Sequence, residues 1–154
     1  MSVTIKSKSD LLKLREAGRI AARALEHAGK VMHPGMTTKQ LDRSIHEFIV
    51  SCGAVPTFLG YGGFPASACI SINEEVIHGI PSNRRVIREG DIVSVDVGAT
   101  FDGFVGDTAY TFAVGDISEE KADLLKVTQD SLYAAIAAAK AGARLGDVSH
   151  TVEE

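Results

Sequence analysis

The segment spanning residues 91–108 constrains the fold more than any other part of the chain. It holds two alternating apolar runs separated by Asp102-Gly103, a dipeptide typical of the tight turn between antiparallel strands. Strands joined by so short a turn pair with each other, because a parallel connection needs a dozen or more residues. The sequence therefore predicts a long β-hairpin with strands over residues 92–99 and 104–112.

Alternation along the first strand distinguishes the two faces of this hairpin. One side carries only valines, and we expect it to meet helices; these residues are Val93, Val95 and Val97. Asp96 points to the other side. If the loop holds an even number of residues, Asp107 shares that side, either directly opposite Asp96 or one diagonal step away. Gly98 and Gly106 are expected to leave room on this face for a ligand to approach.

Two facing carboxylates repel each other unless a proton or a cation lies between them, and aspartate is disfavoured within strands. In the simplest interpretation, one aspartate ends a strand and the other is solvated. In a second, the pair shares a proton as in aspartic proteases, but the Asp-Thr/Ser-Gly signature is absent because Ala109 follows Asp107-Thr108. We favour a third interpretation, in which Asp96 and Asp107 bind a hard divalent cation.

Helical periodicity accounts for much of the remaining chain. A first helix is expected from an N-cap at Ser9 to about Met32, and a second follows a capping box at 37–40 and ends near Gly53. Short strands are expected at 68–73 and 75–78. A third helix is expected over residues 118–141 with Ser118 at its start, and Asp147 is the expected cap of a one-turn helix. This order predicts an α+β fold in which helices pack on one face of an antiparallel sheet.

Two segments before the hairpin carry candidate site residues. His78 is at the end of an expected strand beside Gly79 and Pro81, and it is either a structural histidine or a functional one. The loop at 58–65 combines three aromatic residues with three glycines. It either forms a pocket wall or inserts its rings into the core. The aromatic residues are Phe58, Tyr61 and Phe64.

Composition limits the classes of partner. A net charge of -4 over 154 residues gives no general attraction to nucleic acid or to anionic membranes. Residues 1–10 contain no apolar targeting segment, and no run is long enough to span a bilayer. Cys52 and Cys69 form no C-x-x-C pair, which fits a reducing compartment. We therefore predict a cytoplasmic protein without nucleic-acid or membrane partners.

Several of these segments together resemble the type I methionine aminopeptidases. The resemblance runs from about Ile5 to the end of the chain, in the order and spacing of that family. The motifs that carry it are Tyr61-Gly-Gly-Phe64-Pro65, Cys69-Ile-Ser-Ile-Asn73-Glu74, His78-Gly79-Ile80-Pro81, Gly90-Asp91-Ile92-Val93, Asp96 and Gly106-Asp107-Thr108. It implies the pita-bread fold, in which two similar halves surround a cleft with two divalent metal ions. Residues 1–154 correspond to the N-terminal half of that domain.

The resemblance also implies a role for each candidate residue. Asp96 becomes a metal ligand, Asp107 a ligand that bridges both ions, and His78 a catalytic residue that contacts the substrate near the scissile peptide. The methionine side chain would be received by Phe58, Tyr61, Phe64 and Cys69. The ions would be of the Co, Mn, Fe or Zn class, and the substrate would be the N-terminal Met of nascent polypeptides. A pocket for an unbranched apolar side chain disfavours a proline-directed peptidase of the same fold.

In the family a second half supplies one histidine ligand, two glutamate ligands, a further catalytic histidine and the rest of the pocket. The 154 residues alone are therefore expected to be an inactive fragment that binds metal weakly or not at all. The intact family is monomeric, whereas self-association of this fragment is a further expectation. The alternative is a non-catalytic half-pita-bread module that binds a separately encoded second half or itself.

Overall fold

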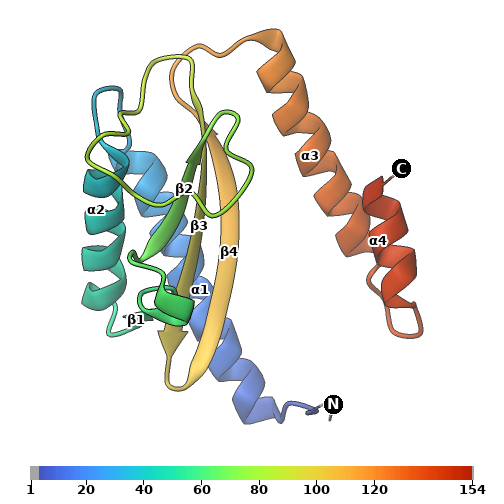
Figure 1. The fold of residues 1–154 in the computed structure, drawn as a ribbon. Helices are drawn as coiled ribbons and strands as arrows, with labels where there is room; N and C mark the ends of the chain where they lie inside the picture. The colour runs from blue at the N-terminus through green and yellow to red at the C-terminus, as the bar shows by residue number, and fades with distance from the viewer. Residues whose placement is uncertain (1–3, 154) are drawn as a thin grey trace. The chain divides into compact units, whose positions relative to one another are not determined.

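The computed structural model describes residues 4–153, so residues 1–3 of the N-terminal segment considered above lie outside it. The elements in chain order are α1 (Lys8–Val31), α2 (Thr38–Ser51), β1 (Val55–Pro56), the 3-10 turn η1 (Tyr61–Gly63), β2 (Ala68–Ile72), β3 (Ile92–Phe101), β4 (Phe104–Ala113), α3 (Glu119–Ala138) and α4 (Leu145–Glu153). The chain divides into two compact units, Met1–Asp116 and Ile117–Glu154 (Figure 1).

The predicted hairpin is the centre of the first unit. β3 and β4 pair antiparallel along their whole length, from Ile92 opposite Ala113 to Phe101 opposite Phe104. Asp102 and Gly103 form the turn with φ values of 48° and 80°, and positive φ at both central residues is the requirement of a type I′ hairpin turn. β2 and β1 pair with the other edge of β3, which makes β3 the central strand of a four-stranded sheet.

Helices α1 and α2 cover one face of this sheet (Figure 1). The alternate valines of β3 are fully buried on that face, as predicted. They pack with apolar residues of both helices, including Ile20, Ala24, Leu41, Ile45 and Ile49. The other face of the hairpin is therefore available for a site.

Capping is confirmed for α2 and differs for α1. The Thr37 hydroxyl accepts a hydrogen bond from Gln40 N at 3.2 Å, and the Gln40 side chain accepts from Thr37 N at 2.8 Å. The predicted cap of α1 at Ser9 is wrong, because Ser7 is the N-cap. Three residues after Ser7 stands Asp10, whose carboxylate accepts from Ser7 N at 2.9 Å. Ser9 has leucine at the corresponding position and cannot form this reciprocal pair.

The strand predicted at 75–78 does not form. The chain turns at Asn73, which has φ 52°, and the Glu75 carboxylate accepts from Ile72 N at 3.0 Å. The side chains of Val76 and Ile77 are exposed, at 85% and 68%. An alternating pattern becomes a strand only where its backbone finds a partner strand, and within residues 4–153 no strand pairs with 75–78.

The second unit contains α3 and α4. Ser118 caps α3 as predicted, and its hydroxyl accepts from Lys121 N at 3.4 Å. The predicted cap at Asp147 is wrong, because α4 begins at Leu145 and Asp147 lies in its first turn, where its carboxylate accepts from Arg144 N at 2.9 Å. No helix within residues 4–153 is long and apolar enough to cross a bilayer.

A close contact between α1 and β4 explains one glycine of the hairpin. A Cβ atom at Gly106 would lie 2.4 Å from the carbonyl carbon and oxygen of Ala17. Gly106 therefore faces α1 and does not open the aspartate face, which corrects the expectation drawn from the sequence. The backbone of the helix takes the space that a side chain would need.

Replacing Gly106 with alanine is expected to destabilise the fold. The new methyl group would collide with helix backbone, and overpacking of this kind costs about 1 to 3 kcal/mol. Urea denaturation followed by circular dichroism measures this cost as a lower free energy of unfolding. The matched control is Gly18→Ala on α1, because a Cβ there would meet no other element within 4 Å in the described part of the chain. Equal stability of the two variants would contradict the contact.

Candidate active site

One cavity of about 630 Å³ in the first unit gathers all the candidate residues. The sequence placed them in four separate segments, and the sheet brings them to a common wall. The candidates that line the cavity are Phe58, Tyr61, Phe64, Cys69, His78, Asp96 and Asp107. The four lining residues that we did not predict as site residues stand in the motifs quoted above; they are Gly62, Gly63, Pro65 and Ile80. The expected shared concavity is confirmed, whereas the role of each residue remains a prediction.

The carboxylate pair has the geometry expected from the hairpin. Asp107 is directly opposite Gly98, and Asp96 is two residues before Gly98 on β3. The two aspartates therefore lie on one face, one diagonal step apart, as one of the two predicted arrangements requires. Asp96 is partly buried and Asp107 is exposed.

The surroundings of Asp96 raise its pKa from an ordinary 3.8 to about 6. Burial is the largest cause, because it removes water from the charged form. The negative charge of Asp107 and a side-chain hydrogen bond with Asp107 raise the pKa further, while the charge of His78 lowers it. The pair is thus a place where a cation or a proton is needed to relieve repulsion.

Cys69 lies directly opposite Asp96 on β2. Its side chain is buried, and burial together with the charges of Asp96 and Asp107 raises the pKa of the thiol to about 11. The side chain is therefore a neutral thiol at physiological pH, which makes it a poor nucleophile and a small apolar surface. It suits the wall of an apolar pocket.

His78 is held at the cavity by its neighbour. Gly79 O accepts from Ile70 N at 2.9 Å, and Gly79 N donates to Ser71 Oγ at 3.0 Å. A Cβ atom at Gly79 would lie 2.2 Å from Ile70 O, so the position admits only glycine. His78 itself adopts φ 59°, an uncommon value for a residue other than glycine. Strain of this kind is typical of functional sites.

The aromatic loop forms the wall of the cavity. Gly60, Gly62 and Gly63 all have positive φ, at 83°, 55° and 84°. They allow the loop to close tightly, with Gly60 N donating to Phe64 O at 2.8 Å. Tyr61 is 79% exposed, and Phe64 is outside the helix-facing core cluster. Of the two interpretations left open by the sequence, the structure supports the pocket wall.

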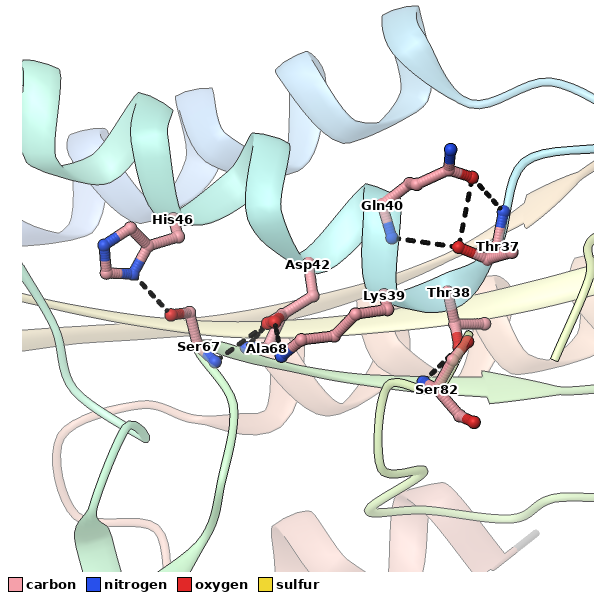
Figure 2. Close-up of polar contacts among 9 residues, drawn as sticks. All are labelled: Thr37, Thr38, Lys39, Gln40, Asp42, His46, Ser67, Ala68 and Ser82. Carbon is pink, nitrogen blue, oxygen red and sulfur yellow. Dashed lines mark hydrogen bonds and ion pairs between the residues drawn. The ribbon is translucent and has the colours of Figure 1, made fainter. Parts of the chain in front are cut away.

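A buried aspartate on α2 positions the junction between this loop and β2 (Figure 2). Asp42 Oδ1 accepts from Ser67 N at 2.8 Å and from Ala68 N at 3.1 Å, and Lys39 forms an ion pair with its other oxygen at 2.8 Å. His46 Nδ1 is 2.8 Å from Ser67 Oγ. We missed this network, although an aspartate directly after the buried Leu41 of an amphipathic helix is a signal for it. It fixes the start of the strand that carries Cys69.

The donor set fits a divalent cation in part. Asp96 and Asp107 provide hard oxygen ligands on one face, and a cation would relieve their repulsion. Within the described residues, no group of three or more His, Cys, Asp or Glu side chains could hold a metal ion. The 154 residues thus contribute a carboxylate pair, and a tightly held ion requires more ligands.

The sequence profile of metallopeptidase family M24 matches residues 12–154. The chain belongs to this family. Membership of M24 implies a metal cofactor, in agreement with the carboxylate pair.

Three proteins to which the chain is similar share one activity in their names. Methionine aminopeptidase of Clostridium acetobutylicum is 51% identical over 152 residues, which cover 99% of this chain and 61% of the relative. Methionine aminopeptidase 1 of Bacillus subtilis is 46% identical, with 98% and 60% covered. The crystal structure of methionine aminopeptidase from Thermotoga maritima matches with a TM-score of 0.94 and 43% identity, covering 97% of this chain and 60% of that one.

These likenesses confirm the predicted fold class, an α+β fold of the pita-bread type. The chain spans about 60% of the length of each of these three proteins. It therefore corresponds to part of the domain seen in those proteins.

Removing the buried carboxylate of Asp42 is expected to lower the free energy of unfolding by about 2 to 3 kcal/mol, because two backbone N–H groups lose a charged acceptor. Chemical denaturation of Asp42→Ala measures this loss. The control is Lys39→Ala, which removes a half-exposed partner of the same carboxylate and should cost about 1 kcal/mol or less. A larger loss in the control would assign the stability to the ion pair.

Replacing Asp107 with asparagine is expected to lower the pKa of Asp96, because a like charge and a hydrogen bond that raise it both disappear. Burial remains, so the pKa stays above its ordinary value of 3.8. Carboxyl ¹³C NMR titration without divalent metal measures the change, and Asp116→Asn, outside the cavity, serves as the control. An unchanged titration of Asp96 in Asp107→Asn would contradict the coupling.

The same shift predicts how stability depends on pH. The folded protein holds the Asp96 proton more tightly than the unfolded chain does. This tighter proton binding therefore stabilises the folded protein below pH 3.8, and the stabilisation is lost as the pH rises through about 6. Asp107→Asn should lose less stability across this interval than the unchanged protein.

Proposed function

We propose that this chain is the N-terminal half of a methionine aminopeptidase, which removes N-terminal Met from nascent polypeptides in the cytoplasm by two-metal hydrolysis. The observation that carries the proposal is the single cavity in which a carboxylate pair, a strained histidine and an apolar aromatic wall meet. The names and identities of the M24 relatives support the choice of substrate.

The carboxylate pair would hold the metal. Asp96 would bind one divalent ion and Asp107 would bridge two, with ions of the Co, Mn, Fe or Zn class. When bound, such ions polarise a peptide carbonyl and activate water at neutral pH. The raised pKa of Asp96 supports this role, because a site that repels a second negative charge favours a cation.

The rest of the cavity would orient the peptide. Phe58, Tyr61, Phe64 and Cys69 form a wall without a charged group at physiological pH, which suits an unbranched apolar side chain such as methionine. His78 would form a hydrogen bond near the scissile peptide. The next residue, Gly79, is hydrogen-bonded to Ile70 and Ser71 of β2, so the backbone that carries the imidazole needs little further ordering for that contact.

We infer that the 154 residues alone bind metal weakly and do not catalyse the reaction. Two carboxylates leave most coordination positions of a divalent ion to water, and the remaining ligands would come from a second half.

The alternative is a non-catalytic module that binds a separately encoded second half or a second copy. Exposed apolar side chains on α3 favour a partner of some kind, because large exposed apolar surfaces mark interaction sites. They are Leu124, Val127, Leu132, Tyr133 and Ile136.

The purified chain is expected to release no Met from a Met-Ala-Ser peptide, even with excess Mn or Co, because two carboxylates cannot hold both ions. The matched control is the Asp96→Asn, Asp107→Asn double variant, which should bind less Mn than the unchanged chain in a calorimetric titration. Mn-dependent release of Met that disappears in the double variant would show a working site and contradict the inactive fragment. Equal Mn binding by both proteins would contradict the metal site.

A further inference from the structure

The presence of glycine at position 98, inside a strand, requires a specific explanation. Gly98 lies inside β3, where glycine weakens a strand, and it is not among the glycines with positive φ, so its backbone conformation does not demand glycine. It shares the face of Asp96 and is directly opposite Asp107. A glycine in such a position indicates the close approach of another group.

The group that approaches is the ring of Phe58. A Cβ atom at Gly98 would lie 2.6 Å from Phe58 Cε1 and 2.9 Å from Thr57 Cβ. The ring therefore rests on the bare backbone of β3, next to the carboxylate pair. This contact corrects the expectation that Gly98 leaves open space for a ligand.

The backbone next to this ring is held in place. Thr57 N donates to Gly98 O at 2.9 Å, and the Thr57 hydroxyl is 2.8 Å from that of Thr100. On the other side, Phe58 O accepts from Tyr61 N at 3.0 Å. A methyl group at position 98 would press on Thr57 Cβ, which this backbone holds in place, and on the Phe58 ring, which can turn about its side-chain bonds. The ring would therefore take up most of the movement. The free space available to the ring is the cavity that Phe58 lines.

We propose that Gly98 is a specificity-determining residue that sets the depth of the side-chain pocket, by allowing the ring of Phe58 to lie against β3. The proposal rests on the function proposed above and assigns the length of the accepted side chain to this contact. With glycine at 98 the pocket takes an unbranched chain as long as methionine. A bulkier residue at 98 pushes the ring inward and shortens the pocket.

NMR titration of the 154-residue chain with L-methioninamide and L-ethioninamide tests this. In the unchanged protein we expect methioninamide to shift the signals of Tyr61 and Phe64. Gly98→Ala should weaken methioninamide binding about tenfold, the effect of roughly one methylene of pocket length. Gly18→Ala, a matched glycine replacement with open space around its Cβ, should leave the affinity unchanged.

Two further variants separate a pocket role from a structural one. Phe58→Ala should raise the affinity for the longer ethioninamide relative to methioninamide by about tenfold. Adding Phe58→Ala to Gly98→Ala should restore methioninamide binding. If circular dichroism shows that Gly98→Ala alone is unfolded, the test remains decisive. The readout is then the ratio of ethioninamide affinity to methioninamide affinity in Phe58→Ala.

The outcomes distinguish this proposal from the function on which it rests. If methioninamide leaves Tyr61 and Phe64 unshifted in the unchanged protein, the proposed pocket is wrong and the role of Gly98 with it. If the unchanged protein binds but folded Gly98→Ala binds equally well, only the role of Gly98 is overturned. An unchanged ethioninamide-to-methioninamide ratio in Phe58→Ala overturns it as well.

Discussion

The register of the β3–β4 hairpin is the constraint on which the rest of the structure depends. A two-residue turn at Asp102-Gly103 fixes the register, which sets Asp107 one diagonal step from Asp96. A slip of one residue would turn Asp107 toward α1 and expose Gly106 in its place. The contact of Gly106 with the backbone of α1 opposes such a slip, since any side chain there would collide with the helix. Helix packing and the carboxylate pair thus depend on the same turn.

The carboxylate pair on the hairpin combines burial with the repulsion of like charges. Burial and the charge of Asp107 raise the pKa of Asp96 to about 6, which shows that the two carboxylates repel each other. A metal ion would relieve this repulsion, and the fold provides the rigid surroundings that hold the pair ready for it. Gly79 positions His78, the Asp42 network anchors β2, and Gly98 provides the surface on which Phe58 rests. These residues position the site through packing and hydrogen bonds and have no part in the proposed reaction.

Features that depend on nearby residues could be predicted from the sequence, and features that depend on distant ones could not. The hairpin and the cap of α2 at Thr37 follow from residues within a few positions of one another. The strand expected at 75–78 failed because pairing requires a partner that local alternation does not reveal. Asp42 was missed for the same reason, since its partners Ser67 and Ala68 are 25 and 26 positions away.

The sequence by itself determined the α+β class, the hairpin, the family resemblance and the identity of the residues that would carry the chemistry. These depend on turn chemistry, alternation and motif spacing, which are encoded along the chain. Only the tertiary structure decided what the glycines do: Gly98 admits the ring of Phe58, Gly106 admits α1, and Gly79 admits the backbone of β2. A glycine in a sequence shows that space is needed, but the group that fills the space belongs to another segment. The tertiary structure alone brings the two together.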